Sequence, residues 1–362
     1  MKIGILTFQQ AINYGAVLQL YALQKIISVL GIDVDIINYI SSKLLSDYKV
    51  IKVNKGFKQF VASLISFFAF AKKKKKFDDF SSKKLKLSVP VSNKSTLGKL
   101  SKEYDYIITG SDQVWNYQIT NYDTTYLLDF TEPKKRLSYA ASFGVSKISE
   151  TLKQTYSELL GDFKYITVRE KQGAKLVKDL CDRDVPVVLD PTLLLNIQDW
   201  KEISDLVSIS SKKIVVYTLS RSDLLMNIAN ELSRITSFDV AVINPRTINL
   251  YDKTSAYTSG PEEFINLFMN AEYILTNSFH GTAFAINFNK RFLVELPDGE
   301  RGKLNSRIEN LLEMLNLKDR YVDCLDLRKM EADIDWEKVN KILDVERKKS
   351  IEHLKMMIGK NE

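Results

Sequence analysis

One of the two histidines in this chain follows a short polar run at the end of an apolar segment. The apolar segment 273–275 leads into Thr276, Asn277 and Ser278, and His280 comes two residues later. A strand that ends in small polar residues just before a helix presents free backbone N–H groups at the edge of its sheet. We therefore expect an anion-binding site here. The alternative is that Asn277 or Ser278 only caps the helix and that His280 is a partly buried filler.

His280 carries the side chain best suited to proton transfer at neutral pH, because an imidazole both gains and loses a proton there. A helix N-terminus alone disfavours the imidazolium form. A bound phosphate or carboxylate favours it. Binding of an anion would therefore make His280 an acid.

Length and composition predict a soluble protein with two cores. The chain has 362 residues, of which 45% are hydrophobic and 27% charged, and single cores seldom grow beyond roughly 250 residues. Cys181 and Cys324 lie far apart without a C-x-x-C pair, so neither a disulfide framework nor a zinc site is indicated. The first eight residues resemble a strand rather than a secretory signal, and we expect a cytoplasmic protein.

The net charge of +7 comes mainly from lysine clusters. These clusters lack the interleaved aromatic and arginine residues of nucleic-acid readers, so no nucleic-acid partner is expected. The apolar stretch 57–71 is too short to span a bilayer, and Lys72–Lys76 follow it at once. Two interpretations are open: peripheral contact with an anionic membrane leaflet, or a helix packed on its own domain with lysines at its C-terminus.

Strand and helix patterns alternate along the chain as in parallel α/β proteins. Strands are expected near residues 2–8, 33–39, 104–109, 136–141, 165–168, 213–219, 239–244, 273–276 and 291–295. We predict two Rossmann-like domains, 1–195 and 196–335, with a basic helical excursion near 55–90 and a C-terminal helix at 336–362 that packs back on both. Ligands of open α/β sheets lie beyond the carboxyl ends of the strands, which would place Asn13, Asp112 and His280 around one cleft.

At several places in the right order, the sequence resembles the polysaccharide pyruvyl transferases. The likeness rests on Asn13–Ala16, Ile107–Asn116, Tyr139–Gly144, Val168–Glu170, Leu189–Thr192 and Thr276–Gly281. The resemblance implies a GT-B-like fold of two facing domains. It also implies phosphoenolpyruvate as donor and a sugar hydroxyl pair of a bacterial surface polysaccharide precursor, free or lipid-linked, as acceptor. If the acceptor is lipid-linked, Lys72–Lys76 could hold the enzyme at the inner face of the membrane, where that acceptor lies.

Ketal formation from phosphoenolpyruvate needs an acid and binders for two anionic groups, and we expect neither a metal nor a cofactor. His280 is the expected acid. Guanidinium groups suit phosphate and carboxylate, and the resemblance places Arg221 on the donor side. A family arginine two residues before the histidine is replaced here by Ser278. Lys303, Asn305 or Arg307 would supply the missing contact, unless that stretch is a surface loop before a capped helix.

The acceptor is expected to bind on the N-terminal domain. An aromatic face packs against a pyranose, and amides or carboxylates bind its hydroxyls. The residues of suitable type are Asn13, Tyr14, Asp112, Gln113, Trp115 and Asn116, with Asp112 as base for the attacking hydroxyl. Trp115 is equally typical of a core residue and Asp112 of a turn. Arg169 and Glu170 are interpreted as an internal ion pair that supports the cleft.

Two other functions remain open. A GT-B glycosyltransferase or sugar epimerase acting on a nucleotide-sugar would share this architecture and a histidine at a helix start. The sequence contains no G-x-G-x-x-G motif that would favour a dinucleotide. Two D-x-D spacings resemble metal-binding motifs, but residues 33–35 are expected in a strand and residues 182–184 at a helix end, so metal binding is not favoured. A carbohydrate-binding scaffold without catalysis would tolerate loss of His280.

Overall fold

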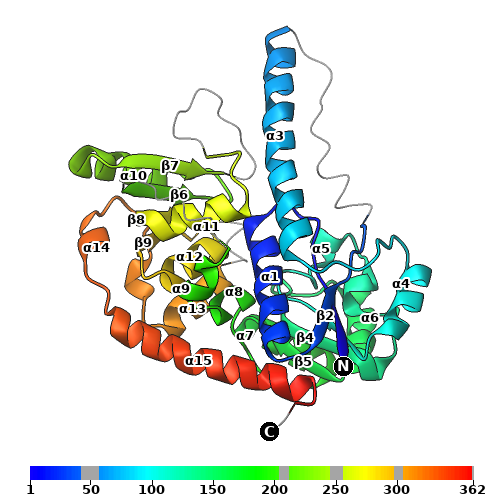
Figure 1. Cartoon of the computed structure of the whole chain (residues 1–362). Helices are drawn as coiled ribbons and strands as arrows, with labels where there is room; N and C mark the ends of the chain where they lie inside the picture. The colour runs from blue at the N-terminus through cyan, green and yellow to red at the C-terminus, as the bar shows by residue number, and fades with distance from the viewer. Residues whose placement is uncertain (42–56, 204–211, 245–255, 297–304, 361–362) are drawn as a thin grey trace.

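The computed structural model describes residues 1–41, 57–203, 212–244, 256–296 and 305–360. Within them the strands form two parallel sheets, as the alternating pattern predicts (Figure 1). Parallel neighbours need a crossover connection, and helices supply it. The α/β fold class predicted from the sequence is therefore confirmed.

The N-terminal sheet has the order β2-β1-β3-β4-β5. Its strands are β1 (Lys2–Leu6), β2 (Asp33–Ile36), β3 (Tyr106–Thr109), β4 (Arg136–Ala141) and β5 (Tyr165–Val168). Its helices are α1 (Tyr14–Val29), α4 (Lys94–Leu100), α5 (Tyr117–Thr120), α6 (Glu150–Gly161) and α7 (Lys171–Cys181). β1 and β3 are buried except for their first residues, because helices cover both faces of a parallel sheet.

The C-terminal sheet has the order β7-β6-β8-β9. Its strands are β6 (Lys213–Tyr217), β7 (Asp239–Ile243), β8 (Ala271–Thr276) and β9 (Arg291–Val294). The accompanying helices are α8 (Pro191–Leu194), α9 (Ile197–Lys201), α10 (Asp223–Thr236), α11 (Pro261–Asn270), α12 (Phe279–Asn287), α13 (Ser306–Met314) and α14 (Arg328–Glu331).

The two sheets share a core. One continuous cluster of buried apolar side chains includes Ile3 and Ile5 of β1, Ile274 of β8 and Phe284 of α12. Helix α15 (Trp336–Met357) lies along the base of the molecule in Figure 1 and joins the halves further. Its Arg347 donates to the carbonyl of Leu193 and to the side chain of Asn287. Helix α15 therefore contacts α8 and α12, and the domain boundaries at 195 and 335 stay predictions.

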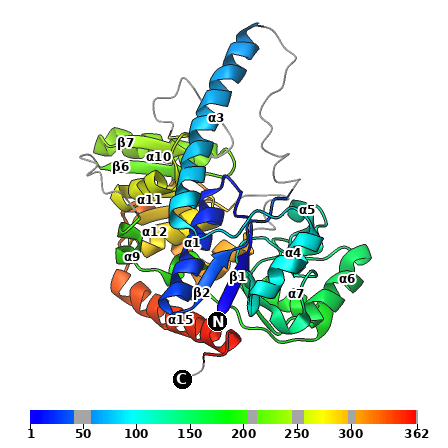
Figure 2. The ribbon, with the colours of Figure 1, turned by 45° about the vertical axis from the view of Figure 1, so that its right-hand side comes forward.

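Helix α3 (Phe57–Lys84) projects from the body of the molecule, as the two views of the ribbon show (Figures 1 and 2). Its C-terminal half is anchored on both domains. Phe77 packs on Tyr14 of α1, and Lys76 forms an ion pair with Glu263 of α11. Most of the basic stretch at 55–90 is therefore one long helix, which contacts α1 through Phe77 and α11 through Lys76.

Candidate functional site

Polar residues that follow strands of both sheets meet between the two domains. Arg169 follows β5 in the N-terminal sheet, and His280 lies in the first turn of α12, just after β8 in the C-terminal sheet. Asp190 joins them: its Oδ2 accepts from Arg169 Nη1 at 2.8 Å and lies 3.6 Å from His280 Nε2. The latter distance fits an ion pair rather than a hydrogen bond.

Asp190 is completely buried and holds the site together. It accepts from the hydroxyl of Ser111 at 2.8 Å and from the hydroxyl and backbone N–H of Thr192 at 2.7 and 3.0 Å. Burial alone would raise the pKa of this carboxyl, but His280, Arg169 and Thr192 together hold it well below its usual range. Asp190 is therefore ionised, and it holds the side chains of Arg169, Ser111 and Thr192 in place.

Arg169 is buried and only partly satisfied. Its Nη1 bonds to Asp190 and, at 3.4 Å, to Ser111, and its guanidinium carbon lies 4.7 Å from the ring centre of Phe279. Its Nε and Nη2 have no hydrogen-bond partner among the described residues. Buried donors are normally paired. A guanidinium with two free donor atoms is thus prepared for a ligand with acceptor oxygens.

Arg307, in the first turn of α13, brings a second guanidinium to the same place. It is buried, and its Nε also has no partner among the described residues. Burial, and then the like charge of Arg169, lowers the pKa of Arg307 to about 10. Two cations that repel each other in a buried site favour an anion between them.

Two glycines allow the close packing of predicted site residues. A Cβ on Gly15, in the first turn of α1, would lie 2.0 Å from Nδ1 of His280, so only glycine lets the imidazole rest on this helix. Gly144 has a φ of +59°, and a Cβ there would lie 1.9 Å from Oε1 of Gln113. Both glycines belong to the motifs on which the family resemblance rests. The glycine at 15 sets the position of His280.

Asp112 lies at the end of β3 beside the arginines. It is partly exposed, and its charge acts on both Arg169 and Arg307. Its φ of +85° falls in the left-handed region, and its Oδ1 accepts from the N–H of Gln113. Strained backbone of this kind concentrates at functional sites. Asn13 is also partly exposed and caps α1 through Ala16.

Other predicted site residues have structural contacts. Asn277 bonds to Leu219 and Ser220 across the sheet edge, and Ser278 caps α12. Tyr14 is buried and donates to the carbonyl of Ser259. Trp115 is buried against Phe143 and Phe163. Asn116 caps α5.

The structure does not bring Arg221 to the cluster. Its side chain is 86% exposed and pairs with Asp223 at 2.9 Å. Asn305 is partly buried and directly precedes α13, two residues before Arg307. Lys303 lies outside the described residues. Of the expected donor-side cations, Arg307 is therefore the one that the described residues place beside Asp190 and Arg169.

Arg169 and Asp190 lie in the site, although no sequence pattern predicted a ligand-binding role for either. Arg169 and Glu170 were expected to pair, and Arg169 Nε does lie 3.9 Å from Glu170 Oε2. Arg169 and Glu170 also lie beside Asp190 and Arg307, however. The sequence motifs that contain Arg169 and Asp190 could have pointed to them, because Val168–Glu170 and Leu189–Thr192 are among the motifs on which the family resemblance rests.

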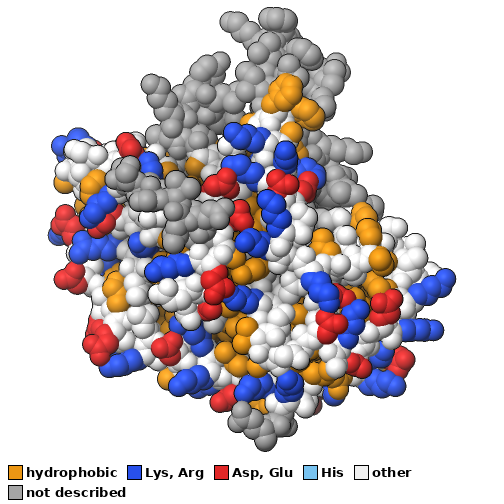
Figure 3. Space-filling model, viewed as in Figure 1, with side chains coloured by type: hydrophobic (Ala, Val, Ile, Leu, Met, Phe, Trp, Pro, Cys, Tyr) orange, Lys and Arg blue, Asp and Glu red, His pale blue; other side chains and the backbone are white. Residues whose placement is uncertain are grey.

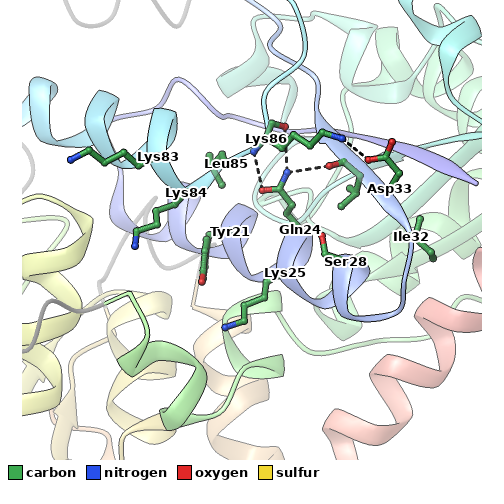
Figure 4. A pocket seen from close by; sticks show the side chains of 11 residues that line it. Tyr21, Gln24, Lys25, Ser28, Ile32, Asp33, Lys83, Lys84, Leu85 and Lys86 are labelled. Atoms are coloured by element: carbon green, nitrogen blue, oxygen red, sulfur yellow. Dashed lines mark hydrogen bonds and ion pairs between the residues drawn. The ribbon is translucent and has the colours of Figure 1, made fainter.

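A separate pocket of about 480 Å³ lies between α1, the start of β2 and the end of α3 (Figure 4). Its wall contains Lys25, Lys83, Lys84 and Lys86. Lys25 pairs with Glu202, and Lys86 with Asp33. None of the residues predicted for the site lines it. Three of its four lysines, Lys25, Lys84 and Lys86, are paired with carboxylates and are less suited to an anion than the free guanidinium donors above.

The fold is shared with known sugar-nucleotide enzymes. The UDP-GlcNAc 2-epimerase from Methanocaldococcus jannaschii covers all of both chains with a TM-score of 0.54 at 12% identity. The epimerase from Rickettsia bellii covers 98% of this chain and 96% of its own, with a TM-score of 0.54 at 10% identity. Identities this low show the fold alone. The protein thus has the GT-B-like fold of two Rossmann-like domains that the resemblance implied.

The family follows from the sequence itself. The family model described as polysaccharide pyruvyl transferase matches residues 13–296. The chain belongs to this family, which confirms the resemblance. Among curated proteins, no sequence matches the chain significantly.

Proposed function

We propose that the protein transfers a pyruvyl group from phosphoenolpyruvate to a sugar hydroxyl pair and forms a ketal. The observation that carries the proposal is the set of free, buried donor atoms on Arg169 and Arg307 beside His280. Leaving such donors unsatisfied costs about 1–3 kcal/mol each. A ligand with phosphate and carboxylate oxygens would satisfy them. Family membership supports the same chemistry.

In the proposed reaction, His280 delivers a proton to the methylene carbon of the donor. One sugar hydroxyl attacks the adjacent carbon, phosphate leaves, and the second hydroxyl closes the ring. The two hydroxyls release two protons: one replaces the proton given by His280, and the other leaves with phosphate. Asp112, partly exposed at the end of β3, is the proposed base for the first hydroxyl.

Asp190 and Gly15 position His280 in this scheme. The carboxylate 3.6 Å from Nε2 stabilises the imidazolium, as a buried carboxylate does in other histidine-dependent sites. We further propose that Asn13 and Gln113 contact the acceptor, because both are partly exposed and follow the neighbouring strands β1 and β3. The buried Tyr14, Trp115 and Asn116 would support that surface from beneath.

The test is release of phosphate from phosphoenolpyruvate with a panel of sugar acceptors. General acid catalysis contributes about 10²- to 10⁴-fold, so His280→Asn should reduce the rate by that factor. His353→Asn is the matched control, because His353 contacts Tyr165 at the base of the molecule. It should leave the rate unchanged.

Calorimetric titration separates this proposal from its alternative. Phosphoenolpyruvate should bind the wild type and bind Arg307→Met at least tenfold more weakly. Binding of a uridine nucleotide-sugar, without binding of phosphoenolpyruvate, would instead assign the protein to glycosyl transfer or epimerisation. Unchanged function of His280→Asn in polymer assembly would favour a scaffold.

We also propose that α3 holds the enzyme at an anionic membrane surface near a lipid-linked acceptor. Phe67 and Phe68 are exposed on the projecting helix, and Lys72, Lys74 and Lys75 are exposed one turn further on. Figure 3 shows hydrophobic side chains on this projection, with Lys and Arg side chains next to them toward the body of the molecule. No described helix is long and apolar enough to cross a bilayer. Exposed aromatics followed by lysines suit the surface of an anionic leaflet.

Flotation with phosphatidylglycerol vesicles tests this contact. Wild-type protein should float at low salt and less so as salt rises. Replacing Lys72, Lys74 and Lys75 with glutamine should abolish flotation. The same change at three exposed lysines elsewhere, Lys99, Lys102 and Lys147, should not. Wild-type protein that stays at the bottom of a low-salt gradient contradicts the proposal.

A further inference from the structure

Glu170 is a buried carboxyl group that the reaction scheme leaves unused. It is the N-cap residue of α7, directly after Arg169, and is 3% exposed. Its Oε1 accepts from the hydroxyl of Ser142 at 2.9 Å. Its Oε2 lies 3.9 Å from Nε of Arg169 and has no hydrogen-bond partner among the described residues. One carboxylate oxygen is thus bound and the other faces the cations.

Charges around Glu170 come from five elements. Arg169 adjoins it after β5, and Arg307 acts on it from α13. Asp190 before α8 and Asp112 after β3 act on both arginines, and His280 in α12 acts on Asp190. Burial is the largest effect and raises the pKa of Glu170, against the lowering by both arginines, Ser142 and the N–H of Phe143.

Within the protein, Glu170 and Asp190 balance the two guanidinium groups. An incoming phosphate or carboxylate brings its own negative charge to the same donors. The bound anion and an ionised Glu170 would then repel each other in a buried place where water screens little. A proton on Oε2 removes this repulsion. It also turns Glu170 from an acceptor into a hydrogen-bond donor.

We propose that Glu170 takes up one proton from solvent when an anionic donor binds between Arg169 and Arg307, and that it then donates a hydrogen bond to the bound anion. The inference rests on the proposed donor site. It deepens that proposal, because it names the residue that couples donor binding to pH. The free Oε2 atom beside Nε of Arg169 is the observation that carries it.

Proton uptake is measured by titrating phosphoenolpyruvate into the protein in buffers of different ionisation enthalpy. At pH 7 the wild type should take up close to one proton per bound donor. Its affinity should fall by up to tenfold between pH 7 and pH 8. Glu170→Gln mimics the protonated carboxyl. It should bind at least as tightly and take up about one proton fewer per bound donor than the wild type, so its affinity should depend less on pH. Protons of the donor's own phosphate contribute equally in both proteins.

Ser142→Ala provides a second variant with an opposite signature. Loss of the hydroxyl that donates to Oε1 removes a stabilising contact of the ionised form. Proton uptake should therefore persist in this variant and extend to higher pH. It keeps the inference testable even where Glu170→Gln fails to fold.

The outcomes are separate from those of the proposed function. Binding of phosphoenolpyruvate by the wild type without proton uptake overturns this inference alone. Uptake that remains in Glu170→Gln and disappears in His280→Gln assigns the proton to His280 and also overturns it. Absence of phosphoenolpyruvate binding overturns the proposed function and this inference with it.

Discussion

Two buried groups of charges flank the start of α1, and they are satisfied in different ways. On one side, His280 rests on Gly15 in a cluster with Asp190, Arg169 and Arg307. On the other side, Lys73 of α3 is fully buried, and its Nζ has no hydrogen-bond partner in the described part of the chain. The first group has opposite charges with donor atoms to spare, and the second has one cation alone.

Aromatic rings replace the missing anion at Lys73. Its Nζ lies 4.8 Å from the ring centres of both Tyr14 and Tyr257 and 6.0 Å from that of Phe77. Such contacts contribute about 2 kcal/mol when desolvated. These rings come from α1, from the segment before α11 and from α3 itself, so Lys73 fixes the projecting helix to both domains. Spare donors indicate a ligand site, whereas a lone cation among rings indicates a structural contact.

Removing Arg169 should have the largest effect on stability. Arg169→Met leaves Asp190 and Glu170 buried without their nearest cation. Breaking a buried ion pair from one side costs about 3–5 kcal/mol. The free energy of unfolding from urea titration should fall by that amount. Bound phosphoenolpyruvate should protect the wild type much more than the variant.

Arg234→Met is the matched control for this change. Arg234 is 72% exposed and pairs with Glu231 on the surface of α10. Surface pairs contribute about 0–1 kcal/mol. A loss in Arg169→Met no greater than that of the control would mean that the cluster is not an interdependent buried network.

Removing the charge of Lys73 should act in the opposite direction. Burial lowers the pKa of Lys73 from 10.5 to about 8, which corresponds to a cost of about 3 kcal/mol for the charged form. The cation–π contacts offset about 2 kcal/mol of it. Lys73→Met should therefore be about 1 kcal/mol more stable than the wild type at pH 7. Lys74→Met, at an exposed position, should change little.

The pH dependence of this difference has a defined sign. Below pH 8 the lysine is charged in both the folded and the unfolded state, and the folded protein bears the net cost that remains after the cation–π contacts. Between pH 8 and 10.5 the unfolded state binds more protons, so wild-type stability rises with pH relative to Lys73→Met. Urea titrations of both proteins at intervals across this range measure the difference. A constant difference would show that Lys73 titrates normally.

The sequence predicted more of the fold than of the site. Alternating strands and helices follow from local patterns, which is why both parallel sheets were anticipated. His280 was found because a polar run follows an apolar strand. Its partner Asp190 and the guanidinium of Arg169 reach it only through the packing of the two domains. Local patterns do not encode such contacts.

Arg221 on the surface and Lys73 in the core also show that local sequence patterns do not predict tertiary contacts. Arg221 follows a strand end as a donor-side residue should, yet its own neighbour Asp223 pairs with it in solvent. Lys73 is one of five successive lysines and looks like the other four in the sequence. Its position one turn before Phe77 was a weak hint of burial. Only the approach of Tyr14 and Tyr257 distinguishes it.

The smallest effect should come from hydroxyl groups around Lys73, and it tests whether ring faces hold the cation. Tyr257→Phe keeps the ring 4.8 Å from Nζ, so stability should change by less than about 0.5 kcal/mol, as for substitutions that spare the key contacts. Tyr14→Phe also keeps a ring but loses the hydrogen bond to the carbonyl of Ser259, which should cost about 1 kcal/mol. In both variants the rise of stability between pH 8 and 10.5 should persist. If Tyr257→Phe removed that rise, the hydroxyl rather than the ring face would be the group that sets the pKa of Lys73. Lys73 would then no longer contrast with the charged groups around Asp190.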